Sequence, residues 1–158
     1  MNLLNANFER FSNILKVLLE NETFENGIVG KSEQYFDDCY REDSIQSMLI
    51  LSKLFTDEFT KEWYGSNNII IGILHILSHK TYSIIYPIGQ MIAISALCIE
   101  NDEICDYTIK CFENWEHTDG IEVLRAKEFQ AWWLETYRIE VLDHLCELRE
   151  NKLEGKDV

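Results

Sequence analysis

The sequence predicts an all-α fold in which antiparallel helices are stacked into one domain. The chain of 158 residues contains one proline and seven glycines, so few residues would interrupt long helices. Apolar residues recur at helical spacing along most of its length. Two long apolar runs, 69–77 and 88–99, are separated by a short polar link. About seven to eight helices account for these segments, in a single domain over 1–158 whose ends, 1–6 and 152–158, are expected to be frayed.

The N-terminal part of the chain contains amphipathic segments of helical length. Apolar residues at i, i+3, i+7 and i+10 predict a first helix over Asn7–Glu20. Lys31–Arg41 is compatible with a second helix. Asp43 offers an N-cap for a third helix, which should end near Trp63–Gly65 because glycine suits the position that follows a helix.

The stretch between Trp63 and Ile99 carries a single formal charge, Lys80. Its first apolar run, Ile69–Leu77, fits either a buried strand or a buried helix, since isoleucine favours strands. No other segment has a strand pattern, and a lone strand would leave its backbone groups without partners. We therefore expect a helix here, at the centre of the fold.

The C-terminal part continues with helices joined by short turns. Pro87 suits the first turn of a helix over Ile88–Ile99, where its missing N–H does no harm. Apolar periodicity then predicts helices over Glu103–Trp115, Ile121–Ala126 and Glu128–Glu150.

The segment around the proline also has the pattern of a known repeat. An apolar helix containing the small residues Gly89, Ala93, Ser95 and Ala96 is followed by the turn Glu100-Asn101-Asp102. A second helix then carries Ile109, Phe112 and Trp115. In these features Pro87–Trp115 resembles a HEAT-type helical repeat. The resemblance covers less than a third of the chain, and it implies that the helices form a stacked, HEAT-like array.

The formal net charge of −14 is spread over both halves of the chain. A field of this sign repels phosphate backbones and attracts basic proteins, so we expect no direct binding of nucleic acid. The five cysteines are odd in number and contain no CxxC pair, which indicates a reducing compartment. The N-terminus lacks a signal-peptide pattern and the apolar runs are too short to span a bilayer. A cytoplasmic protein with no membrane contact is expected.

No motif of catalysis or cofactor binding emerges. His75 and His79 are spaced i, i+4, but Ile76 stands where a zincin requires glutamate, and no third ligand is evident. The cysteines have acidic or apolar surroundings, which raise thiol pKa values. Gly30-Lys31-Ser32 matches only the end of a phosphate-binding loop, and Asp37-Asp38 is expected to be solvated. We therefore expect no enzyme, no catalytic residue, no cofactor and no metal.

Two acidic surfaces are the candidate binding sites. The first, an acidic stripe, comprises Glu140, Asp143, Glu147 and Glu150 at i, i+3, i+7 and i+10, and Arg138 and Arg149 are expected to relieve part of the repulsion between them. A second surface, relieved by Lys110, comprises Asp102, Glu103, Asp106, Glu113 and Glu116. Like charges at this spacing destabilise a helix, so a stripe of them is a candidate binding face; ordinary solvated faces are the alternative. Trp115 and Trp132 are candidate aromatic anchors.

These features favour a non-enzymatic module that binds a basic protein through an acidic face. In size, acidity and cysteine content the chain resembles the immunity proteins of contact-dependent inhibition and related polymorphic toxin systems. That resemblance implies an antitoxin that covers the basic active site of a nuclease toxin.

Two other classes of function remain open. A helical-repeat scaffold or adaptor would be indicated by an exposed aromatic patch around Trp132 and Trp133. A small enzyme or ligand-binding protein would require a pocket formed by His75, His79, Tyr82 and Tyr86.

Overall fold

The computed structural model describes residues 3–61 and 67–155, and within these residues every regular element is a helix. The all-α prediction is confirmed. The helices are α1 (Leu3–Asn21), α2 (Lys31–Glu42), α3 (Ser44–Phe59), α4 (Asn67–Ser78), α5 (Tyr82–Ile85), α6 (Ile88–Ala96), α7 (Asp102–Trp115), α8 (Gly120–Arg125) and α9 (Trp132–Glu154).

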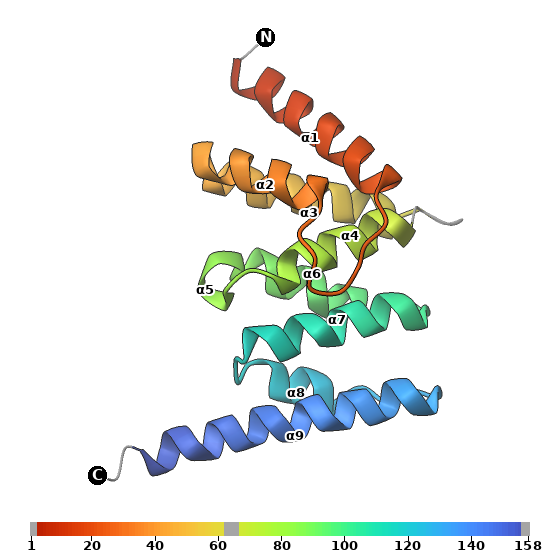
Figure 1. Ribbon diagram of the computed structural model, residues 1–158, viewed down its shortest axis with the longest axis vertical. Coiled ribbons are helices and arrows are strands. Elements are labelled where there is room, and N and C mark those ends of the chain that lie inside the picture. The colour runs from red at the N-terminus through yellow and green to blue at the C-terminus, as the bar shows by residue number, and fades with distance from the viewer. Residues whose placement is uncertain (1–2, 62–66, 156–158) are drawn as a thin grey trace.

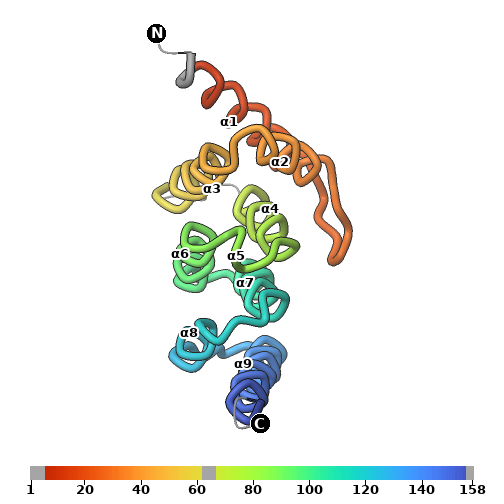
Figure 2. The backbone as a smooth tube through the Cα atoms, turned by 90° about the vertical axis from the view of Figure 1, so that its left-hand side faces the viewer, coloured from red at the N-terminus to blue at the C-terminus, as the bar shows by residue number. Residues whose placement is uncertain are grey.

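The helices are stacked along one axis in two layers. Figure 1 shows α1 at one end of the stack and α9 at the other. In the perpendicular view of Figure 2, α3, α6 and α8 form one layer and α4, α7 and α9 form the other. Consecutive helices alternate between layers and run antiparallel, so α4, α7 and α9 run in the same direction and end on the same side (Figure 1). Each helix pair buries its apolar faces against the next pair along the stack.

Helix α4 is the centre of the core. Every residue from Ile69 to Ser78 is buried, because α1, α3, α6 and α7 all pack against this helix. A helix surrounded in this way needs no polar face, which explains why a continuous isoleucine-rich run folds as a helix. Gly72 permits the closest of these contacts: a Cβ at this position would lie 2.5 Å from side-chain atoms of both Leu19 and Phe24.

Several helix boundaries differ from the predictions. Helix α1 already begins at Leu3 and α9 continues to Glu154, so both helices extend into the end segments that the sequence predicted to be frayed. Helix α3 ends at Phe59, and the predicted end at Trp63–Gly65 lies outside the described residues.

Helix α6 is shorter than predicted, and α9 is shifted toward the C-terminus. Pro87 occupies the N-cap position of α6 and follows a cis peptide bond, and α6 ends at Ala96 rather than Ile99. Helix α9 begins at Trp132, not Glu128. The backbone N–H of Phe129 donates to Glu135 Oε2 at 2.8 Å, so the residues before α9 form a turn that a side chain of its first turn holds in place.

Candidate functional site

The acidic stripe (Glu140, Asp143, Glu147 and Glu150) lies on the outward face of α9 and is named the α9 stripe. Helix α9 packs inward through Leu134, Val141 and Leu145, against α7 and α8. At 100° per residue, Asp143 and Glu150 project roughly opposite these buried side chains. All four acids of the stripe are exposed.

The basic side chains that the structure describes do not neutralise this stripe. Arg138 is buried: its guanidinium donates to the Glu135 carboxylate through Nε and Nη2, and Nη1 donates to the carbonyl of Leu124 at 2.8 Å. The expected relief by Arg138 is therefore wrong. Among the described residues, no cationic nitrogen lies within 4.0 Å of a stripe carboxylate.

The second acidic surface, on α7, is partly occupied by internal contacts. Asp102, Glu103 and Glu116 are exposed, whereas Asp106 and Glu113 are half-buried. Glu113 accepts a hydrogen bond from the Tyr137 hydroxyl and lies 3.5 Å from Lys110 Nζ.

Asp106 is the least favourably placed of the α7 carboxylates. Burial raises the pKa of Asp106; Lys110 opposes this shift, and the Glu103 and Glu113 carboxylates add to it. A half-buried anion among other anions is poorly compensated within the chain, and a basic group from outside would compensate it.

The two acidic surfaces adjoin because α7 and α9 are neighbours in one layer. His144 Nε2 of α9 lies 3.9 Å from Glu116 Oε1 of α7. An open pocket of about 550 Å³ lies between the two helices and the end of α4, and its lining residues are Ser78, His79, Glu113, Asn114, Glu116 and His144. The pocket thus places Glu113 and Glu116 of α7 beside His144 of α9.

The two candidate anchors have opposite environments. Trp115 is 6% exposed, and its indole N–H donates to the Leu77 carbonyl at 2.9 Å. Its prediction as a partner-binding residue is wrong, since it joins α7 to α4. Trp132 is 78% exposed and lies on the same outward face of α9 as Ile139 and Asp143.

Ile139 and Trp133 complete an apolar patch beside the acids. They are 44% and 42% exposed. Sequence reasoning missed Ile139, although the signal was present: apolar residues occur all round α9, whereas the last helix of a stack normally has a polar outer face.

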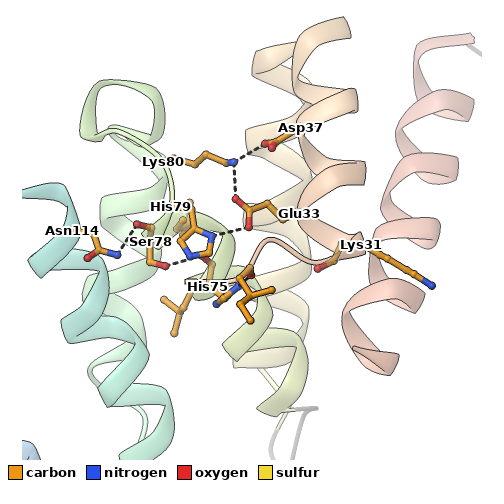
Figure 3. A network of polar contacts seen from close by, with 12 residues as sticks. Lys31, Glu33, Asp37, His75, Ser78, His79, Lys80 and Asn114 are labelled. Carbon is orange, nitrogen blue, oxygen red and sulfur yellow. Dashed lines mark hydrogen bonds and ion pairs between the residues drawn. The ribbon is translucent and has the colours of Figure 1, made fainter. Parts of the chain in front are cut away.

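The two central histidines gain a third partner that the sequence did not reveal. Glu33 of α2 lies beside His75 of α4 and His79, the residue after α4, and one potential ligand atom from each residue lies within 4.8 Å of the others. Figure 3 shows Glu33 between the His79 ring and the Lys80 ammonium. His79 Nδ1 is 2.7 Å from Glu33 Oε2, and Lys80 Nζ is 2.9 Å from Glu33 Oε1 and 2.7 Å from Asp37 Oδ1.

This cluster is largely withdrawn from solvent. Glu33 and His75 are each 2% exposed. Burial lowers the pKa of His75, although the Ile28 carbonyl, which contacts Nε2 at 2.8 Å, opposes the shift. Burial would likewise lower the pKa of Lys80, but the Asp37 and Glu33 carboxylates raise it above its ordinary value.

The tyrosines proposed for a pocket with these histidines belong to a different group of contacts. The Tyr82 ring stacks on His117 at 3.8 Å between ring centroids, and its hydroxyl donates to Asp119 at 2.6 Å. Tyr86 packs on Tyr82. His75 instead contacts Phe24, Tyr107 and His79.

The other motifs considered have structural explanations. The N–H groups of Lys31 and Ser32, at the start of α2, donate to the Glu22 carboxylate, which takes the place that a phosphate would occupy. Asp37 pairs with Lys80 and Asp38 with Arg41.

All five cysteines are free thiols, and burial raises the pKa of Cys111.

Of the described helices, none combines the length and the apolar character needed to cross a membrane.

Comparison with known proteins adds no relative. No protein-family model matches the chain, and no curated protein or solved structure shows significant similarity to it.

Proposed function

We propose that the protein is a non-enzymatic module that binds a basic protein through the outward face of α9 and the adjoining acids of α7. One observation carries the proposal: the four carboxylates of the α9 stripe are exposed and have no ion-pair partner among residues 3–61 and 67–155, and they lie on the same helix as the exposed side chains of Trp132 and Ile139. An aromatic anchor next to a charged surround is a typical arrangement of residues that contribute most to binding.

The energetic cost of the stripe supports a functional role. Neighbouring carboxylates at i, i+3 and i+4 repel one another. A basic partner would relieve this repulsion on binding. The same field would accelerate association and reject acidic competitors.

The partner that best fits this chemistry is the basic domain of a nuclease toxin. Such a domain binds a phosphate backbone, and an acidic face of the same charge density would compete for the same surface. This is the function that the resemblance to immunity proteins implies. The free thiols fit a protein that acts in the reducing cytoplasm.

A scaffold or adaptor function is the second candidate, because Trp132, Trp133 and Ile139 form an exposed apolar patch. The two functions differ in what supplies affinity. Binding to a basic toxin would weaken strongly as salt increases, since exposed charges are screened. Binding through the apolar patch alone would be nearly insensitive to salt.

The decisive experiment compares two variants with matched changes of charge. Glutamine or asparagine replaces the four stripe acids in the first variant. In the second, glutamine replaces four exposed acids at the other end of the stack: Glu9, Glu20, Glu25 and Glu42. The wild-type chain should capture a basic nuclease domain from its native cells and suppress that domain's activity.

We expect the stripe variant to lose at least about tenfold in affinity, whereas the control variant should bind normally. An equal loss of affinity in both variants would show that binding depends on net charge alone and not on the stripe. Unchanged binding of the stripe variant, together with loss on Trp132→Ala, would favour the scaffold function.

A further inference from the structure

We propose that Glu33, His75 and His79 form a zinc-binding site that joins α2 to α4. The sequence predicted no metal because it revealed only two of the three ligands. The fold supplies the third, on a helix far away in the chain. The chemical class follows from the donors: two imidazoles and one carboxylate are a ligand set that suits zinc better than calcium or magnesium, which prefer oxygen alone.

The three side chains are already close to ligand geometry. Their ligand atoms lie within 4.8 Å of one another, while ligands of a tetrahedral zinc ion are about 3.3 Å apart at bond lengths of ~2.0–2.1 Å. The two imidazole centroids are 4.4 Å apart because an i, i+4 spacing places both rings on one face of α4. Small side-chain rotations would therefore complete the site without a change of backbone.

The surrounding groups orient the three candidate ligands, as the outer partners of metal ligands do in proteins. The Ile28 carbonyl can only accept a hydrogen bond, so His75 Nε2, at 2.8 Å from it, carries the proton and Nδ1 keeps its lone pair. Lys80 holds Oε1 of Glu33 at 2.9 Å, which leaves Oε2 toward the histidines. Metal ligands in proteins commonly have such outer partners, which fix the tautomer and the orientation of each ligand.

Charge and access also fit a dication. Glu33 and Asp37 bring two negative charges to the cluster and Lys80 one positive charge, so a bound zinc ion would meet a net negative site. His79 lines the 550 Å³ pocket, through which an ion could enter from solvent. The pocket would also leave room for water at the fourth coordination position. The ring of Phe24 closes the other side against His75, with centroids 5.4 Å apart.

The same contacts also describe a buried ion-pair network without metal, and a binding experiment separates the two. The full chain is first stripped with a chelator, and Cys98→Ser and Cys146→Ser remove the more accessible thiols. Zinc is titrated by calorimetry. Cobalt(II) is the spectroscopic probe, since a site with few ligands gives an intense visible absorption that thiolate ligands would alter recognisably.

We expect one zinc ion per chain, with micromolar or tighter affinity and a rise in Tm. Glu33→Gln and His79→Gln should each weaken binding at least about tenfold, while His117→Gln, at a half-exposed histidine outside the pocket, serves as the matched control and should bind normally. Equal weakening by His117→Gln would overturn the assignment. So would a wild-type chain that shows neither the cobalt absorption nor a zinc-dependent rise in Tm, and this result does not depend on whether any variant folds.

Discussion

Neutralising the α9 stripe should make the protein more stable. The change is Glu140→Gln, Asp143→Asn, Glu147→Gln and Glu150→Gln together. The stripe contains three like-charged pairs at i, i+3 or i+4: 140–143, 143–147 and 147–150. Each such pair costs about 0.2–0.5 kcal/mol, so the free energy of unfolding should rise by about 0.6–1.5 kcal/mol, which is a Tm increase of about 1–6 °C for a chain of this size.

Thermal and urea unfolding at low salt, followed by circular dichroism, measures this gain. The gain should shrink in 1 M salt, where the Debye length is about 3 Å. The variant with changes at Glu9, Glu20, Glu25 and Glu42 should gain less, because no two of these residues are spaced i, i+3 or i+4. A stripe variant that is less stable than wild type at low salt would refute the view that these carboxylates repel one another without compensation.

The same variant should bind the basic partner more weakly. If the substitutions stabilise the protein and also weaken binding, the stripe is a site where stability is lower for the sake of function. A helix face that is merely solvated would show the gain in stability with no loss of binding.

Three single substitutions test the packing of the core, each by urea unfolding. Gly72→Ala should lower the free energy of unfolding by about 1–3 kcal/mol, because its Cβ would lie 2.5 Å from core side chains. Trp115→Phe should cost about 1–2 kcal/mol, since it removes the bond to the Leu77 carbonyl, which still accepts from a backbone N–H. Lys80→Met should cost about 3 kcal/mol, because Glu33 would remain buried with only a histidine to compensate it.

Each of these substitutions has a matched control on the surface. Gly155→Ala places a Cβ in ordinary contact with one backbone oxygen at 3.4 Å. Trp132→Phe changes an indole that is 78% exposed. Lys53→Met removes an exposed ion pair with Asp57, which is worth little. Each control should change the free energy of unfolding by less than about 1 kcal/mol, and a larger change would indicate that burial is not the cause of the core effects.

Much of the fold could be predicted because helical periodicity is a local property of the sequence. The pattern located every helix of more than one turn, and the lack of charge around Ile69–Leu77 identified the central helix. Helix ends were less predictable. Helix α9 begins at Trp132 because Glu135 caps a turn over the preceding residues, and the spacing of apolar residues carries no signal for such a contact.

The candidate sites depended on tertiary contacts that periodicity cannot supply. The spacing placed Trp115 in the apolar stripe of α7, yet it could not decide whether the indole also reached a partner; its bond to Leu77 settles that it faces inward. Arg138 was likewise expected to offset the negative charge of the α9 stripe, but its guanidinium donates to the Leu124 carbonyl. Glu33 reaches His79 only because α2 packs beside α4 near the N-terminal end of the stack.

The position of α9 at the end of the stack limits how a partner can bind. Its 23 residues give a helix about 34 Å long and, with side chains, about 10 Å wide. One face of such a rod offers roughly 340 Å², whereas a stable complex buries about 800 Å² on each side. A partner that stacked on α9 like another repeat would therefore have to extend past its edge, and on the α7 side that edge leads into the acidic pocket.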